Sequence, residues 1–274
     1  MPRYTPPPDA CDAHCHIFGP AARFPLAEGR TYTPPDRGKE DLAALYARLG
    51  LTRSVIVQGA AHGTDNSAML DAIASSNGRY RGVALIDDSF DDKALQALHE
   101  GGVRGVRFGF VRHLRARPNL GFFRRTVDRI APLGWHAQIH LDAADLIELR
   151  GELDALRIPF VIDHMGRVDA EGGVDQPAFC ALLEQVRREN CWVKVSGSDR
   201  VSAIGAPFHD ALPFARALVE AAPDRVVWGT DFPHVNPRHA VQDDTALLDL
   251  LPLMADEAGL HRLLVTNPAR IYGF

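Results

Sequence analysis

The apolar residues of this chain gather in short runs that are separated by longer stretches with a different spacing. The short runs show little alternation with polar residues, which is typical of strands buried on both faces of a parallel sheet. We therefore predict eight strands, at Ala10–Phe18, Ser54–Ala60, Arg81–Ile86, Val103–Phe110, Trp135–Leu141, Phe160–His164, Trp192–Ser196 and Val226–Thr230.

The stretches between these runs carry apolar residues at helical spacing, which predicts amphipathic helices. Examples are Asp41–Leu49, Ser67–Ala74, Asp91–Leu98, Leu120–Ile130, Ala144–Leu156, Pro177–Arg188 and Phe208–Ala221. Eight strands that alternate with helices over about 250 residues are what a (β/α)8 barrel requires. We predict an α/β fold, a single-domain (β/α)8 TIM barrel over residues 1–274, with the proline-rich residues 1–9 as an N-terminal arm.

A doubly wound open sheet is the alternative that the same alternation allows. Its dinucleotide-binding form carries a Gly-x-Gly-x-x-Gly turn after the first strand, and no such turn follows residues 10–18 here. The 274 residues are 46% hydrophobic, which is enough for one large core, and no linker divides the chain. The barrel is the favoured fold.

Charge and cysteine content narrow the class of protein. A net charge of -5 without a basic run argues against a nucleic-acid partner and favours a small-molecule ligand. The chain shows no signal-peptide pattern and no apolar run long enough to span a bilayer, so we expect a cytoplasmic protein with no membrane partner. No C-x-x-C spacing is present, which predicts reduced, mostly buried thiols at Cys11, Cys15, Cys180 and Cys191.

Candidate chemistry begins with a His-x-His pair, His14 and His16, at the end of the first predicted strand. Alternate residues of a strand share a face, so both imidazoles project to one side and could hold a metal or an electrophilic oxygen together. A packed, hydrogen-bonded pair is the structural alternative. The choice depends on what the other strands contribute.

Polar or ionisable groups stand at most of the other predicted strand ends, and in a barrel these ends converge on one mouth. Singly, each has a structural explanation, such as packing for His140, an ion pair for Arg107 or a turn cap for Asp231. Together they would bury several unpaired charges, at a cost of several kcal/mol each, so a shared site is the better interpretation. The segments are His14–His16, Arg107, Gln138–His140, Asp163–His164, Ser196–Arg200 and Gly229–His234.

The motifs at these positions resemble those of the amidohydrolase superfamily, amidohydrolase family 2. More narrowly, they resemble the branch of 2-pyrone-4,6-dicarboxylate lactonases and related sugar or muconic lactonases. The resemblance runs from the first strand to the last residue. It is carried by His14-Cys15-His16, Val106–Val111, His140, Ile162-Asp163-His164-Met165-Gly166, Gly229-Thr230-Asp231-Phe232-Pro233-His234 and Asn267–Phe274.

The resemblance implies a hydrolase that opens the lactone ring of a small anionic, carboxylated substrate, an intermediate of aromatic-compound degradation. Asp231 would be the base that deprotonates water and later protonates the leaving oxygen. His14, His16 and His164 would surround the carbonyl oxygen and stabilise the charge that develops on it.

Substrate-binding residues follow from the same resemblance. Arg107, Arg112 and Arg200 suit the fork geometry of carboxylate recognition, and the local spacing allows Arg115 in place of Arg112. Tyr32 resembles a loop tyrosine that contacts substrate, with a structural rim aromatic as its alternative. His234 is expected to line the pocket, whereas His62 is read as packing in its loop.

Two departures from the branch bear on a cofactor. His140 stands where the dicarboxylate lactonases, which work without a metal, carry a tyrosine, and Ala60 replaces a serine. The superfamily's metal-dependent members use strand-one, strand-five and strand-eight ligands. Here that set consists of His14, His16, His140 and Asp231, which suits one divalent ion, zinc or manganese, although a metal-free mechanism stays open.

Three other functions remain as alternatives. One is a metal-dependent decarboxylase of aromatic acids, which would release carbon dioxide. Another is a sugar-acid lactonase or lactone isomerase, for which fewer arginines are expected. A non-catalytic binding protein is the last, and it is disfavoured because a base, electrophiles and anion-binding groups are all present.

Overall fold

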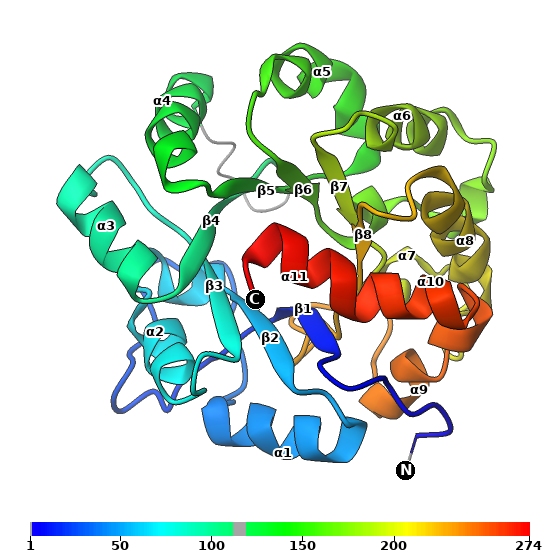
Figure 1. The fold of residues 1–274 in the computed structure, drawn as a ribbon, viewed down its shortest axis with the longest axis horizontal. Helices are drawn as coiled ribbons and strands as arrows, with labels where there is room; N and C mark the ends of the chain where they lie inside the picture. The colour runs from blue at the N-terminus through cyan, green and yellow to red at the C-terminus, as the bar shows by residue number, and fades with distance from the viewer. Residues whose placement is uncertain (1, 112–118) are drawn as a thin grey trace.

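Eight parallel strands form one sheet in the order β1 to β8, as predicted (Figure 1). The computed structural model describes residues 2–111 and 119–274. Every observed strand ends earlier than predicted, because its last residues leave the sheet for the loops above it. The strands are β1 Cys11–Cys15, β2 Arg53–Val57, β3 Tyr80–Ala84, β4 Val103–Gly109, β5 His136–His140, β6 Phe160–Ile162, β7 Cys191–Lys194 and β8 Val226–Val227.

Three backbone hydrogen bonds close the barrel between β1 and the segment after β8. Ala13 N donates to Trp228 O at 2.8 Å, His16 N to Phe232 O at 2.7 Å, and Asp231 N to His14 O at 2.7 Å. The register of β1 against β2 shifts between Asp12 and Cys15, as at a β-bulge. This seam places Asp231 beside the His-x-His pair.

Helices surround the strands on the outside of the barrel (Figure 1). The seven predicted helices are all present, two of them with the predicted bounds, whereas α7 and α9 to α11 were not predicted. The helices are α1 Lys39–Leu49, α2 Ser67–Ala74, α3 Asp92–Glu100, α4 Leu120–Ile130, α5 Leu146–Ala155, α6 Pro177–Val186, α7 Ser198–Val201, α8 Leu212–Ala221, α9 Asp244–Leu248, α10 Glu257–His261 and α11 Asn267–Tyr272.

The C-terminal helix α11 lies across one end of the barrel (Figure 1). Tyr272 packs with Val55 and Val227 in a small buried cluster of strand residues, separate from the large core between strands and helices. Arg53 and Arg81, at the starts of β2 and β3, lie over the Phe274 ring at 5.4 and 4.8 Å. The closed end is therefore the end where the strands begin, and the opposite end is left for a site.

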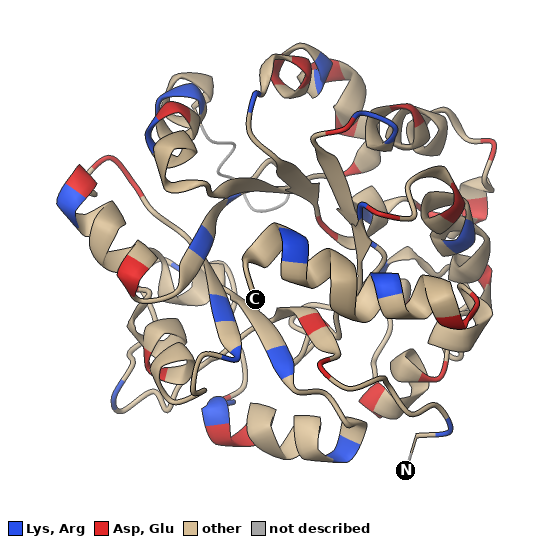
Figure 2. Ribbon diagram, viewed as in Figure 1, with Lys and Arg blue, Asp and Glu red and all other residues tan. Residues whose placement is uncertain are grey.

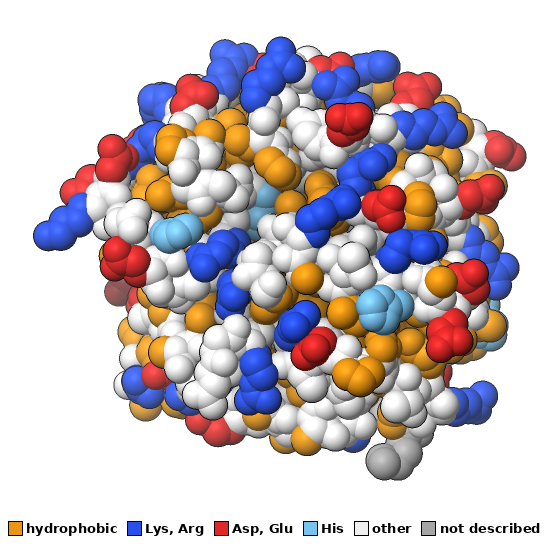
Figure 3. All heavy atoms as spheres, in the orientation of Figure 1, with side chains coloured by type: hydrophobic (Ala, Val, Ile, Leu, Met, Phe, Trp, Pro, Cys, Tyr) orange, Lys and Arg blue, Asp and Glu red, His pale blue; other side chains and the backbone are white. Residues whose placement is uncertain are grey.

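Residues of both charges are distributed over most elements (Figure 2), and they are interspersed on the face shown in Figure 3. Of the four cysteines, which form no disulfide, only Cys180 is exposed. No helix in the described part of the chain is long and apolar enough to cross a membrane.

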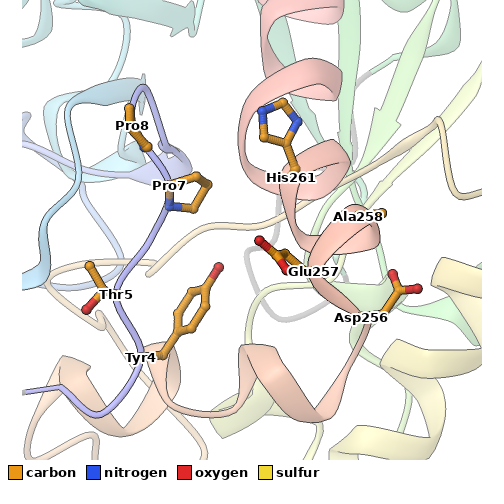
Figure 4. A pocket seen from close by; sticks show the side chains of 8 residues that line it. All are labelled: Tyr4, Thr5, Pro7, Pro8, Asp256, Glu257, Ala258 and His261. Atoms are coloured by element: carbon orange, nitrogen blue, oxygen red, sulfur yellow. The ribbon is translucent and has the colours of Figure 1, made fainter.

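A groove of about 870 Å³ lies between the N-terminal residues and α10. Tyr4 and Pro7 face Glu257 and His261 across it (Figure 4). The backbone N–H groups of Arg3 and Tyr4 donate to Asp249 Oδ1, which holds these residues against the barrel. This groove is the largest cavity described, but none of the predicted site residues lines it.

Candidate active site

A cavity opens at the end of the barrel where the strands finish. Most of the predicted site residues line it, and His14, on β1, is fully buried, whereas His16, just after β1, is slightly exposed. The lining residues are His16, Tyr32, Ala60, Arg107, His140, His164, Arg167, Arg200, Asp231, Val235 and Asn236.

Asp231 lies at the centre of the site and is fully buried. Its Oδ1 is 3.3 Å from His16 Nε2, 3.6 Å from His14 Nε2 and 3.7 Å from His164 Nε2. Among the described residues, this oxygen has no hydrogen-bond partner. A buried carboxylate oxygen without a partner is costly, so this oxygen, which faces three imidazoles, is a candidate for contact with a ligand.

The other oxygen of Asp231 is held by Arg200. Arg200 Nε donates to Asp231 Oδ2 at 2.6 Å, and the terminal nitrogens donate to Val235 O at 2.9 Å and Asn236 O at 3.2 Å. Burial opposes ionisation of Asp231, but Arg200 and then His164 outweigh it and hold the pKa of Asp231 well below its usual value. Arg200 is thus committed to the carboxylate and the adjoining loop, in addition to lining the cavity where it was predicted to bind substrate.

The imidazoles are oriented by their second ring nitrogens. His16 Nδ1 lies 2.7 Å from Val57 O and donates to this carbonyl oxygen, so the ring is held with its Nε2 toward Asp231 Oδ1. His164 Nδ1 lies 3.0 Å from Ser196 Oγ. Burial lowers the pKa of His164 to about 3, so this ring is neutral at pH 7.

Arg107 approaches the cavity from β4 and is partly exposed. Its Nε donates to Asp163 Oδ2 at 3.0 Å. Within residues 2–111 and 119–274, no hydrogen bond from its terminal nitrogens is present. Arg167, which follows β6 and was not predicted, adds a further guanidinium to the cavity, with its Nε on Asp142 Oδ1 at 2.9 Å.

His140, His234 and Arg112 are further predicted residues. His140 lines the cavity with its ring centroid 6.1 Å from that of His164, and its buried Nδ1 has no partner within the described ranges. His234 Nε2 pairs with Asp244 Oδ1 at 2.7 Å, and His234 does not line the cavity. Arg112 and its alternative Arg115 lie outside the described residues.

Tyr32 and His62 both contact the ring of Phe18. Tyr32 lines the cavity and meets the Phe18 ring edge to face at 6.4 Å. His62 stacks on Phe18 at 5.9 Å and its Nδ1 lies 3.1 Å from Pro25 O. This agrees with the interpretation of His62 as a packing residue.

Three of the four predicted metal ligands come together. One donor atom from each of His14, His16 and Asp231 lies within 4.8 Å of the others, and His14, Asp163 and His164 form a second such group. His140 belongs to neither group. By position, the first group fits one divalent cation.

Sequence reasoning missed Lys194, which is fully buried in β7 and contacts His14. A signal was present, because a lysine within an apolar strand is almost never fully buried unless it is paired. Lys194 and His14 are 180 residues apart, however, and only the closed barrel brings them together.

Comparison with known proteins agrees with this geometry. The amidohydrolase family model matches residues 11–274. A 2-pyrone-4,6-dicarboxylate hydrolase of Comamonas testosteroni is 46% identical, over 99% of this chain and 92% of that protein. A 4-sulfomuconolactone hydrolase of Rhizobium radiobacter is 41% identical, over 97% of this chain and 91% of that protein.

The fold is also shared with a solved structure. The apo crystal structure of an Agrobacterium tumefaciens protein matches with a TM-score of 0.88 at 30% identity, and the match covers 100% of this chain and 99% of that chain. The resemblance predicted from the motifs is confirmed. This chain belongs to the amidohydrolase family, in the branch that includes the 2-pyrone-4,6-dicarboxylate hydrolases.

Proposed function

We propose that this protein hydrolyses the lactone ring of a small carboxylated compound, an intermediate of aromatic-compound degradation. The observation that carries the proposal is Asp231 Oδ1, a buried carboxylate oxygen without a hydrogen-bond partner among the described residues and faced by three imidazoles. The names of two similar proteins, hydrolases of a pyrone dicarboxylate and of a sulfomuconolactone, support an anionic lactone.

Asp231 is the proposed base. Arg200 fixes Oδ2, so Oδ1 is the oxygen that accepts a proton from water as the water attacks the lactone carbonyl carbon. Collapse of the tetrahedral intermediate breaks the ring C–O bond, and Asp231 returns the proton to the departing oxygen. His16 Nε2, 3.3 Å from Oδ1, is close enough to contact the attacking water and so orient it.

The carbonyl oxygen needs hydrogen-bond donors, because negative charge develops on it as the water adds. His14 and His164 direct their Nε2 atoms toward the same region as Asp231 Oδ1. Both rings have pKa values lowered by burial, so they act as neutral donors rather than imidazolium ions. A neutral donor stabilises the oxyanion without neutralising the nearby base.

The anionic group of the substrate is assigned to Arg107, with Arg167 on the neighbouring wall. Arg107 keeps only its Nε on Asp163 within the described residues, so its two terminal nitrogens can form a bidentate pair with a carboxylate. Tyr32 closes the rim beside them. A neutral lactone would form no charge-assisted hydrogen bond with these guanidinium groups.

A divalent ion, zinc or manganese, would be held by His14, His16 and Asp231, and it would supply Lewis acidity at the carbonyl oxygen or lower the pKa of the attacking water. The steps assigned above to the side chains do not require it.

A substrate panel tests the proposal. Purified protein is supplied with pyrone dicarboxylate, muconolactones and sugar-acid lactones in a pH-stat, with and without added zinc or manganese, beside the Asp231→Asn variant. We expect acid release from carboxylated unsaturated lactones and none from the variant. Hydrolysis confined to uncharged lactones, or release of carbon dioxide in place of ring opening, would contradict it.

A further inference from the structure

Lys194 is a fully buried cation that the proposed reaction does not use directly. Its Nζ lies 2.8 Å from Ala13 O, 2.8 Å from Gln138 Oε1 and 3.3 Å from His14 Nδ1. An ammonium group has three hydrogens and no acceptor. Asp163 Oδ1 lies farther from Nζ, at 3.6 Å as an ion pair, so the three shorter contacts take the three hydrogens and His14 Nδ1 is an acceptor.

Gln138 fixes the direction of this network. Its Oε1 accepts from Lys194, and its Nε2 donates to Asp163 Oδ2 at 3.2 Å. The flipped amide would place an NH2 group against the ammonium and an oxygen against the carboxylate, which are both repulsive. The orientation is therefore set by chemistry, and Lys194 keeps its contact with the ring of His14.

Asp163 competes with Lys194 for the Nδ1 atom of His14. Its Oδ1 lies 3.3 Å from His14 Nδ1, yet this oxygen forms no hydrogen bond within the described parts of the chain. Its Oδ2 is taken by Arg107 and Gln138. A histidine that binds a metal usually donates its second N–H to such a carboxylate. In this protein Lys194, rather than a carboxylate, forms the hydrogen bond with Nδ1 of His14.

We propose that Lys194 is a positioning residue that keeps the single ring proton of His14 on Nε2. His14 then donates a hydrogen bond to the lactone carbonyl oxygen, and a metal ion could bind its Nε2 only by displacing this proton. The buried ammonium also repels a divalent cation at the His14, His16 and Asp231 group. This inference rests on the proposed function of the same site, but its tests do not depend on turnover.

The wild-type protein provides the first test. Long-range proton–nitrogen spectra of metal-free protein labelled with nitrogen-15 in its histidines report which ring nitrogen carries the proton, and the His14 signal is the one lost in His14→Gln. We expect Nε2 to be protonated and Nδ1 to be bare at pH 7. A proton on Nδ1 would overturn the inference, and this result needs no Lys194 variant to fold.

Lys194→Met provides the second test, with Lys93→Met on exposed α3 as the matched control. Removal of the ammonium lets the His14 proton move to Nδ1, where it faces Asp163 Oδ1. We expect the spectra to show that move and Zn²⁺ titration to show affinity increased by about tenfold or more, the scale of neighbouring-group effects on metal ligands. Lys93→Met should match the wild type.

Two outcomes would overturn the role of Lys194. One is a folded Lys194→Met protein with the wild-type His14 tautomer, and the other is unchanged Zn²⁺ affinity. Lys194→Gln retains an N–H donor without the charge, so a wild-type tautomer with increased Zn²⁺ affinity in this variant would assign the two effects to donor and charge separately. If no lactone is hydrolysed, the proposed function fails while these readouts still decide the inference.

Discussion

Two buried aspartates flank the seam between β1 and β8, and they differ in how their oxygens are used. The carboxylate of Asp12 accepts from His14 N and Thr230 N at 3.0 Å each, from Thr230 Oγ1 at 2.5 Å and from Tyr46 Oη at 3.1 Å. Asp231 has Arg200 on Oδ2 and no hydrogen bond to Oδ1 within the described residues.

The difference separates a structural carboxylate, Asp12, from the carboxylate that we propose as the base, Asp231. Asp12 ties β1 to β8 and to Tyr46 of α1, on the helix-facing side of the barrel, and every nearby donor is satisfied. Burial raises the pKa of Asp12 to about 6, and its hydrogen bonds only partly oppose this. Asp231, held ionised by Arg200, keeps one oxygen for a ligand. Residue type and burial are the same, so the unpaired oxygen makes the distinction.

Asp231→Asn should have the largest effect on activity. The amide keeps the shape of the side chain but cannot accept the proton of the attacking water. We expect kcat to fall by about 10²–10⁴-fold, while substrate binding by calorimetry is largely retained. Initial rates of ring opening measure the first quantity. A variant with kcat near that of the wild type would remove Asp231 as the base.

Asp12→Ala should have the largest effect on stability. It leaves buried donors of His14 and Thr230 without acceptors, at a cost of about 1–3 kcal/mol for each one. Urea unfolding measures the loss, with Asp87→Ala, an exposed aspartate, as the control. If Asp12→Ala unfolded at the same urea concentration as this control, the structural assignment of Asp12 would be wrong.

Substitutions of Arg107 and Arg200 should change kcat and KM differently. Arg107→Met removes a guanidinium that is open to the ligand, so we expect KM for a carboxylated lactone to rise by about tenfold with a small change in kcat. Arg200→Met releases Asp231 and should lower kcat as well. Steady-state kinetics of both variants on one substrate separates these roles, and identical changes in the two would show that Arg200 only binds substrate.

Asp199 extends the comparison of buried aspartates, because its contribution to stability should depend on pH. Both of its oxygens lack hydrogen bonds within the described chain, and burial, followed by Asp231, raises its pKa to about 6. Because folding raises this pKa, the ionised form is penalised, and the wild type loses stability from this group as pH rises from about 4 through 6.

Asp199→Asn removes that penalty. The free energy of unfolding of the variant minus that of the wild type should be larger at pH 8 than at pH 4 by about 2–3 kcal/mol, measured by urea unfolding at both pH values. An equal difference between the two proteins at both pH values would show that Asp199 titrates normally.

Apolar spacing was enough to predict the eight strands and the seven helices between them, because strand and helix place buried positions at different intervals. The barrel then followed, and with it the convergence of His14, His16, His164 and Asp231. The helices near the C-terminus were missed because α9 to α11 are short and interrupted.

The sequence did not predict which side chains form hydrogen bonds with each other. Nothing in the spacing shows that Arg200 contacts the base, or that His140 stands apart from the other three metal-ligand candidates. Both facts depend on distances across the mouth of the closed barrel. Lys194 was missed for the same reason, since its partners come from β1 and β5.

Hydrolysis in water enriched in oxygen-18 tests the central claim most directly. If Asp231 activates water against the lactone carbonyl, mass spectrometry will show one heavy oxygen in the newly formed carboxylate of the ring-opened product, and Asp231→Asn will form no such product. A product without heavy oxygen would indicate isomerisation, and loss of carbon dioxide would indicate decarboxylation. Either result would contradict the assignment of this site to lactone hydrolysis.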